Sequence, residues 1–238
     1  MDKGSFVSPE LRSTVRSRIV PIARLFGRAG LTPNALTVIG LAVAVVAAAA
    51  AANQALFAAG LLVVFGGAFD AFDGALARAT GTASKFGAFL DSTLDRAGEA
   101  VVYVGLAIAC TRAGFEVGAW LAASAMAASF MVSYTRAKSE SLGFSAGSGM
   151  ASVGLAPREV RIAILTVALL GAGLVGGLAP MATFGDSYIV SSHVDTTGDL
   201  ILGGGLALIT LLATITTIQR ILAVRAQAQA QTQSEETR

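Results

Sequence analysis

Four aspartates that lie in strongly apolar stretches of the chain are the residues best suited to chemistry. Asp70 and Asp73 share one stretch, and Asp91 and Asp95 share the next. An ionisable side chain inside an apolar helix is costly, and its presence there indicates a functional site. At about 100° per residue, each pair falls on one face of a helix. The sequence therefore predicts two acidic stripes on two consecutive helices.

The spacing of the aspartates around a polar turn predicts that the two stripes meet. The turn covers residues 80–84, and Asp73 and Asp91 lie nine residues before and nine residues after its centre. Asp70 and Asp95 lie twelve before and thirteen after. If the two helices are antiparallel neighbours, the four carboxylates meet at two matching levels. Glu99 continues the second stripe by one more turn, and we expect it to pair with a neighbouring helix.

Four carboxylates in an apolar environment need nearby positive charge if they are to stay ionised. Oxygen ligands suit Mg²⁺, Mn²⁺ or Ca²⁺. Two such cations bridged by carboxylates recur in enzymes of phosphoryl chemistry. Arg78, close to the first stripe, would contact a phosphate group. The acids could instead be satisfied by ion pairs with Arg78, Lys85 and Arg96, although the regular stripes exceed what pairing requires.

The composition indicates the kind of protein that positions these acids. Of the 238 residues, 54% are apolar and 13% are charged, against about 25% charged in a typical soluble domain. The mean hydropathy is +0.70. These values exclude a disordered chain and predict an all-α integral membrane protein. A bilayer core needs about 20 apolar residues per helix, and six predicted spans meet that length: 33–52, 55–79, 85–111, 117–137, 159–179 and 199–220.

The basic residues predict the orientation of the spans. With the N-terminus in the cytoplasm, sixteen of the seventeen Lys and Arg residues fall on the cytoplasmic side, and only Arg112 falls outside. Both termini are then cytoplasmic, and the acids face the cytoplasm from the cell membrane. We expect residues 1–30 to form an amphipathic juxtamembrane segment, with a helix lying on the membrane surface. Residues 31–225 would form the six-helix domain, and residues 226–238 a polar, disordered tail.

The acidic stripes belong to a longer pattern of fixed spacing. The chain reads Asp70-x-x-Asp73-Gly74-x-x-Ala77-Arg78, then eight residues, then Gly87-x-x-x-Asp91-x-x-x-Asp95. This pattern resembles the signature of the CDP-alcohol phosphotransferase family of membrane enzymes. The resemblance implies transfer of a phosphatidyl-type group from a CDP-linked lipid, such as CDP-diacylglycerol, to an alcohol, with release of CMP.

The resemblance also implies roles for individual residues. Asp70, Asp73 and Asp91 would hold two divalent cations, Mg²⁺ or Mn²⁺, with Asp95 close enough to contribute. Asp95 would also be the general base that deprotonates the acceptor hydroxyl. A further set would hold the CDP part of the donor: Asn34, Ala35, Leu36, Thr37, Gly74, Arg78 and Ser84. The family forms homodimers, and we expect membrane lipids but no nucleic acid among the partners.

A second group of basic residues bears on the acceptor. The segments 133–140, 156–161 and 217–220 are similar to segments of the phosphatidylinositol phosphate synthase branch of the family. That similarity implies that inositol 1-phosphate is the acceptor and that basic residues hold its phosphate: Arg136, Arg158, Arg161 and Arg220. Glycerol 3-phosphate or another alcohol remains an alternative acceptor.

A cation transporter is the alternative from another functional class. It would place its acids near the middle of the bilayer, on discontinuous helices. The acids here lie close to a polar turn, and no proline interrupts residues 55–79 or 85–111. An enzyme is therefore the favoured interpretation.

Overall fold

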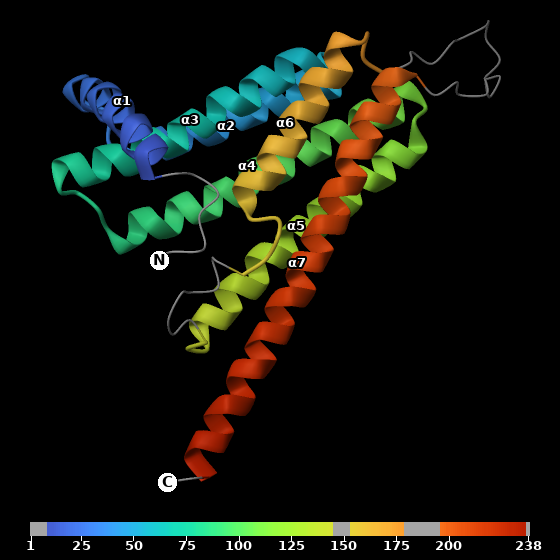
Figure 1. The fold of residues 1–238 in the computed structure, drawn as a ribbon. Helices are drawn as coiled ribbons and strands as arrows, with labels where there is room; N and C mark the ends of the chain where they lie inside the picture. The colour runs from blue at the N-terminus through green and yellow to red at the C-terminus, as the bar shows by residue number, and fades with distance from the viewer. Residues whose placement is uncertain (1–8, 145–152, 179–195, 237–238) are drawn as a thin grey trace, which may run out of the picture.

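The computed structural model describes residues 9–144, 153–178 and 196–236 (Figure 1). Over these ranges the chain forms helices and no strand, as predicted. Residues 1–8 of the expected juxtamembrane segment, 179 of the fifth expected span, and 237–238 of the expected tail lie outside the described residues. The described helices are α1 Pro9–Arg28, α2 Pro33–Ala52, α3 Leu56–Thr80, α4 Lys85–Ala113, α5 Glu116–Ser141, α6 Arg158–Leu174 and α7 Thr197–Glu236.

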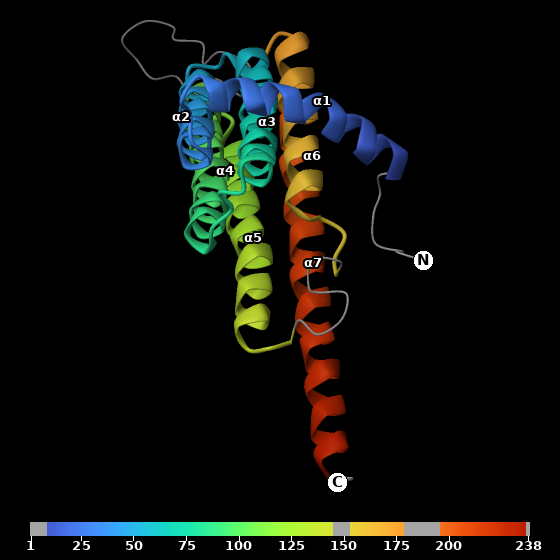
Figure 2. The same cartoon turned by 90° about the vertical axis from the view of Figure 1, so that its left-hand side faces the viewer.

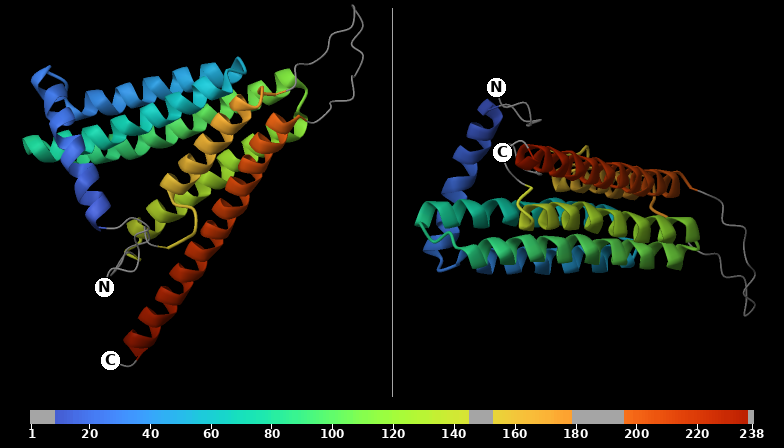
Figure 3. Two further views of the ribbon diagram at one scale, coloured as in Figure 1. Left: turned by 45° about the horizontal axis from the view of Figure 1, so that its top comes forward. Right: turned by 90° about the horizontal axis from the view of Figure 1, so that it is seen from below.

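Six of the helices pack into a closed ring. In order around the ring, α2 packs against α3, α3 against α6, α6 against α7, α7 against α5, α5 against α4, and α4 again against α2. Figure 3 shows these helices running side by side. Helix α1 lies outside the ring and crosses it against α3 (Figure 2).

The predicted helical hairpin around residues 80–84 is present. Gly81 ends α3 in the left-handed conformation, with φ 68°, which glycine adopts at little cost. Ser84 then caps α4 by accepting a hydrogen bond from the Gly87 N–H at 3.0 Å. The two helices of this hairpin are not a main packing pair in the described structure, because α2 packs against both. The expected direct contact between the two acidic helices is therefore replaced by contact through α2.

The start of α2 has its own sequence signal. Thr32 is its N-cap residue and accepts a hydrogen bond from the Ala35 N–H at 3.2 Å. Pro33 follows as the first helical residue, a position where the missing N–H costs nothing. These two residues fix the start of α2 and therefore the positions of Asn34 and Thr37 near that end of the helix.

Apolar packing is concentrated in two clusters. The larger lies in the half of the ring remote from the aspartates and includes Leu56, Leu106, Cys110, Leu169 and Leu206, all at most 1% exposed. This cluster closes the ring at that end.

The smaller apolar cluster holds α1 in place. Ala23 of α1 is fully buried with Leu36, Phe69 and Leu76. The Phe26 ring of α1 stacks at a tilt on Phe72, with 5.5 Å between centroids. The predicted amphipathic N-terminal helix is thus present, and its apolar face packs partly on α3. Its position on the membrane surface stays a prediction.

The predicted count of six membrane spans is not confirmed. Among the described residues, four helical segments are long and apolar enough to cross a membrane: Pro33–Ala52, Leu56–Thr80, Glu116–Ser141 and Thr197–Gln233. Helix α4 falls short because it carries the charged residues of the second stripe. Helix α6 has 17 residues, about 26 Å of helix, which is less than a bilayer core of about 30 Å.

The expectation of a disordered tail is wrong for the part that the structure describes. Helix α7 has 40 residues and continues through residue 226 to Glu236. Alanine, glutamine and glutamate dominate this segment, and all three favour helix even where no tertiary packing supports it. Polar composition alone was therefore a poor guide to disorder here.

A substitution at the contact of α2 and α4 tests this packing. A Cβ atom on Gly105 would lie 2.8 Å from Ala48 Cα. Gly105→Ala should lower the free energy of unfolding by about 1–3 kcal/mol, because the two backbones must separate. Thermal unfolding in detergent measures this. Gly204→Ala is the control, since a Cβ there meets nothing within 4 Å. Equal midpoints for the two variants would contradict the close approach of α2 and α4.

Candidate active site

Three cavities meet at the four aspartates. An apolar cavity of about 660 Å³ is lined by Asp70 and Asp95. A cavity of about 450 Å³, rich in arginine, is lined by Asp91 and Asp95. A third, of about 240 Å³, is lined by Asp73 and Asp91. Each aspartate therefore lies on the wall of at least one cavity, and Asp91 and Asp95 each lie on two.

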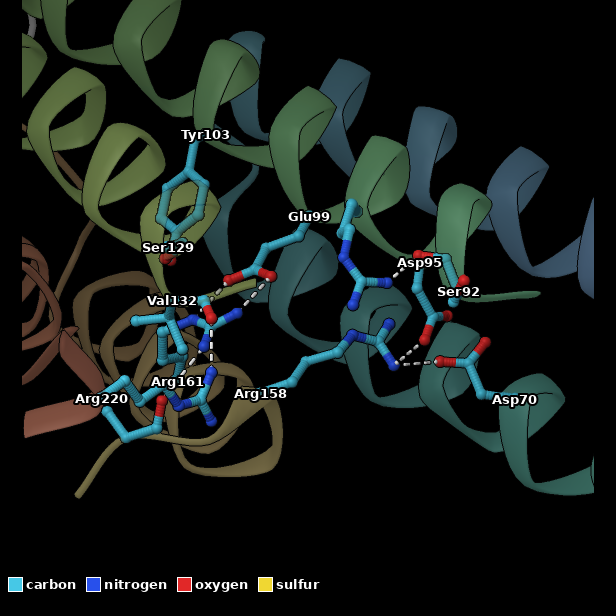
Figure 4. A network of polar contacts seen from close by, with 12 residues as sticks. Asp70, Ser92, Asp95, Glu99, Tyr103, Ser129, Val132, Arg158, Arg161 and Arg220 are labelled. Atoms are coloured by element: carbon cyan, nitrogen blue, oxygen red, sulfur yellow. Dashed lines mark hydrogen bonds and ion pairs between the residues drawn. The ribbon is translucent and has the colours of Figure 1, made fainter. Parts of the chain in front are cut away.

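Arg158 links the two acidic stripes. Its Nη1 atom lies 2.9 Å from Asp70 Oδ2 and 2.8 Å from Asp95 Oδ2. Figure 4 shows this guanidinium, at the start of α6, pointing between a carboxylate of α3 and a carboxylate of α4. One nitrogen thus offsets two negative charges from helices that barely pack on each other. The prediction that the stripes approach each other is correct, although a residue of a third helix joins them.

The other two aspartates have different surroundings. Asp73 is 5% exposed, and its Oδ2 accepts a hydrogen bond from the Thr37 hydroxyl of α2 at 2.7 Å. Asp91 Oδ1 is buried and has no hydrogen-bond partner in the described structure. A buried carboxylate oxygen without a partner is costly. Asp91 is therefore an oxygen donor available to a ligand.

The smallest of these three cavities is lined by most of the residues predicted to hold the CDP part of the donor. Five of the seven predicted residues line it: Asn34, Thr37, Gly74, Arg78 and Ser84. Glycines form part of its wall. A Cβ on Gly74 would lie 3.2 Å from Arg78 Nη1, and one on Gly87 would lie 3.3 Å from Asn34 Oδ1. Side chains at these positions would fill the space that a ligand needs.

Two residues of the predicted CDP-binding set do not line this cavity. Leu36 is fully buried in the apolar cluster beneath α1. The Ala35 N–H donates to the Thr32 cap. Both belong to the local structure that places Asn34 and Thr37, so their contribution to the site is indirect.

The largest cavity is lined mostly by apolar side chains of four helices. Leu41 and Ala44 come from α2, Leu62 and Val63 from α3, and Ile162 from α6, while Gly98 of α4 completes the wall. Its polar end is formed by Asp70, Asp95 and Arg158. A ligand with a long apolar part and a charged head would match this arrangement.

The arginine-rich cavity brings together all four residues predicted to hold an acceptor phosphate: Arg136, Arg158, Arg161 and Arg220. They come from α5, α6 and α7 and converge on one space. The cavity also contains Arg96, which follows Asp95 directly in the sequence. Arg96 was absent from the predicted set, and its position directly beside the predicted base Asp95 was the signal that could have suggested it.

The predicted arginines differ in how they are held. Arg136 Nε lies 2.9 Å from Glu140 Oε1, and both side chains are more than 40% exposed. The guanidinium of Arg220 donates to the carbonyl oxygens of Val153, at 3.0 Å, and Val132. Arg161 pairs with Glu99. The expectation that Glu99 pairs with a neighbouring helix is thereby confirmed.

A comparison with protein families identifies the fold and its chemistry. Residues 30–188, well over half of the chain, match the model for CDP-alcohol phosphatidyltransferase. The chain belongs to this family. It is therefore a transferase of phospholipid biosynthesis, and the transporter alternative is set aside.

Two relatives of this transferase are named as synthases of inositol-containing lipid phosphates. The archaetidylinositol phosphate synthase of Pyrococcus horikoshii is 38% identical over 68% of this chain and 81% of its own length. The phosphatidylinositol phosphate synthase of Cutibacterium acnes is 35% identical over 86% of this chain and 91% of its own length.

Solved structures resemble this transferase over most of its length. The phosphatidylinositol phosphate synthase of Mycobacterium tuberculosis in complex with manganese and citrate has a TM-score of 0.69 and 27% identity, covering 87% of this chain and 88% of its own. The same enzyme with CDP-DAG bound has a TM-score of 0.68 and 30% identity, covering 87% and 92%. A similar protein thus binds manganese and CDP-DAG on this fold.

The acids of this transferase fit a divalent cation in chemical type. They supply only oxygen donors, which Mg²⁺ and Mn²⁺ prefer, and Asp91 Oδ1 is buried without a partner. Their present spacing is wider than a bound cation needs: within the described residues, no three His, Cys, Asp or Glu side chains converge closely enough to hold a metal. Arg158 Nη1 contacts both Asp70 and Asp95, so its positive charge occupies the place beside these two carboxylates.

The hydrogen bond from Thr37 to Asp73 can be tested for its effect on metal binding. Thr37→Val removes the donor and keeps the shape of the side chain. We expect Mn²⁺ to bind about 10-fold more weakly, because partners that orient metal ligands typically contribute 10–100-fold in affinity. Electron paramagnetic resonance of bound and free Mn²⁺ measures this.

Thr93→Val is the matched control for Thr37→Val. The Thr93 hydroxyl donates to the Phe89 carbonyl of its own helix, on an exposed face. Its loss should leave Mn²⁺ affinity unchanged. If both variants bind Mn²⁺ as the parent protein does, Thr37 does not orient Asp73 for a metal.

Proposed function

We propose that this transferase moves the phosphatidyl-type group of CDP-diacylglycerol to a hydroxyl of inositol 1-phosphate and releases CMP. The observation that carries the proposal is the meeting of three cavities of different chemistry at one group of aspartates. An apolar cavity suits the lipid, a glycine-walled cavity suits the nucleotide, and an arginine-rich cavity suits an anionic acceptor.

The donor would lie across two of these cavities. Thr37 lines both the apolar cavity and the glycine-walled cavity, so the two are neighbours beside Asp73. The acyl chains would lie among the apolar residues of α2, α3, α4 and α6. The cytidine and its phosphates would lie beside Gly74, with Arg78 toward the phosphates. A lipid joined to a nucleotide by a pyrophosphate is an elongated molecule, and its two ends match these two neighbouring cavities.

The acceptor would lie in the arginine-rich cavity. Arg136, Arg158 and Arg220 line it from three different helices, and guanidinium groups bind phosphate in a fork geometry. The names of the relatives favour inositol phosphate over glycerol 3-phosphate. A carboxylate on the same wall, Glu140, would accept hydrogen bonds from ring hydroxyls.

Asp95 would act as the general base. Its carboxylate lines both the apolar cavity and the arginine-rich cavity, so it lies between the two substrates. It would take the proton of the acceptor hydroxyl as that oxygen attacks the lipid-bearing phosphorus. The bond from this phosphorus to the oxygen of CMP would then break, and CMP would leave with the bonding electrons.

Asp70, Asp73, Asp91 and Asp95 would hold two divalent cations, Mg²⁺ or Mn²⁺. When bound, these cations would neutralise the pyrophosphate of the donor and the charge that develops on CMP. The remaining catalytic work belongs to the chain: Arg158 orients Asp95, Thr37 orients Asp73, and the arginines place the acceptor. We further propose that the enzyme is a six-span protein of the cell membrane, a homodimer, with its cavities open to the cytoplasm.

An acceptor screen tests the proposed reaction. Purified protein with CDP-diacylglycerol and Mg²⁺ or Mn²⁺ should release CMP when inositol 1-phosphate is added. Free inositol should react with a kcat/KM about 100-fold lower, because hydrogen bonds to a charged phosphate contribute about 1.5–3 kcal/mol each. If the protein turns over glycerol 3-phosphate faster than inositol 1-phosphate, the acceptor assignment changes. No CMP release with any polyol phosphate would refute the proposed function.

The role of Asp95 is tested by its amide variant. Asp95→Asn should lower kcat by at least about 100-fold, the usual contribution of a general base. Its affinity for CMP, measured by calorimetry, should remain because the nucleotide cavity lies on other residues. Glu159→Gln is the matched control, since Glu159 lines the same two cavities as Asp95. Loss of turnover in the Glu159 variant alone would move the base to Glu159.

A further inference from the structure

Glu99 and Arg161 form the most buried ion pair of the described structure, with side chains 5% and 1% exposed. Arg161 Nε donates to Glu99 Oε1 and Nη2 donates to Oε2, both at 2.9 Å. Figure 4 shows the two groups facing each other, and the Arg161 side chain is more buried than that of Arg158. The charges satisfy each other in the two-pronged geometry that a buried pair requires.

The remaining nitrogen of the Arg161 guanidinium binds the backbone that leads into α6. Its Nη1 donates to the Ala156 carbonyl at 3.1 Å. The Ala156 N–H in turn donates to the Thr216 hydroxyl of α7 at 2.9 Å. Pro157 comes next, and Arg158 is the first residue of α6. Arg161 therefore fixes the point from which Arg158 extends.

The pair lies in register with the contact at the acids. Glu99 follows Asp95 by four residues on α4, and Arg161 follows Arg158 by three on α6. These spacings put both pairs on the same two helix faces. One contact, Arg158 with Asp95, lies at the substrates, and the other lies one turn deeper. Because α6 packs mainly on α3 and α7, side chains rather than backbone contacts set its distance from α4.

We propose that Glu99 and Arg161 are a positioning pair for the acceptor. They hold α6 against α4 so that Arg158 faces Asp95 and the acceptor phosphate. Arg161 then acts through Arg158 and is not itself a phosphate ligand, because its Nε, Nη1 and Nη2 are all engaged within the protein. This inference rests on the proposed transfer to a polyol phosphate.

The test is Glu99→Gln, with steady-state kinetics in both substrates. A positioning pair predicts that KM for inositol 1-phosphate rises about tenfold, because misplaced binding groups lose much of their effect. Glu99 also borders the apolar cavity, but Glu99→Gln keeps the size of its side chain, so KM for CDP-diacylglycerol should change by less than about twofold. If Arg161 bound the phosphate directly, freeing it from Glu99 would leave the acceptor KM unchanged or lower it. That result would overturn the inference.

Further variants separate positioning from loss of folding. Glu99→Leu combined with Arg161→Leu replaces the charges by apolar side chains, which a buried site often tolerates. This double variant should fold, bind CMP normally and still show the raised acceptor KM. Arg161→Lys keeps the positive charge, so it should raise the acceptor KM less than the double variant does. A wild-type acceptor KM in the double variant would also overturn the inference.

Thr210→Val is the matched control. Thr210 lies on α7, and its hydroxyl donates to the Leu206 carbonyl of the same helix at 2.8 Å. Its variant should leave both KM values unchanged. If the parent protein releases no CMP with any polyol phosphate, the proposed function fails. If the parent is active and the Glu99 variant matches it, only the positioning role fails.

Discussion

Ion pairing across the space between α4 and α6 is the interaction on which the active site depends. Carboxylates on apolar helices are unfavourable unless a counter-charge is held close to them. The chain supplies that charge from α6, through Arg158 at the acids and Arg161 one turn deeper. Removing one member of a buried pair typically costs about 3–5 kcal/mol, because its partner stays charged. The geometry of the site is thus tied to the stability of the ring.

The ring also separates the environments that the reaction needs. Its remote half is filled by small and branched apolar side chains and excludes water. Its other half opens into cavities whose polar residues lie at one level. A lipid chain and a charged acceptor can therefore approach the same aspartates through walls of opposite character. The low charge content of the sequence reflects this division, since the charged residues needed are few and gathered at one end.

The sequence predicted the parts of this site that depend on local spacing. The acidic stripes and the polar turn at residues 80–84 follow from residues within a few positions of each other. The convergence of Arg136, Arg158 and Arg220 was inferred from resemblance, and the structure brings them to one cavity. What the sequence could not show was tertiary: α2 lies against both acidic helices, and Arg161 turns toward Glu99. Both depend on how whole helices pack together, which the local spacing of residues does not specify.

The shared walls of the three cavities limit how such an enzyme can change. Thr37, Asp91 and Asp95 each border two cavities, so replacing any of them alters the surroundings of two ligands at once. Residues such as Arg136 and Ala137 border the arginine-rich cavity and neither of the other two. If the acceptor binds in the arginine-rich cavity as proposed, divergence toward a new alcohol is least constrained on α5, where a change would leave the lipid and the nucleotide undisturbed. On this fold, residues that would contact only the acceptor can be replaced without changing those that would contact the donor.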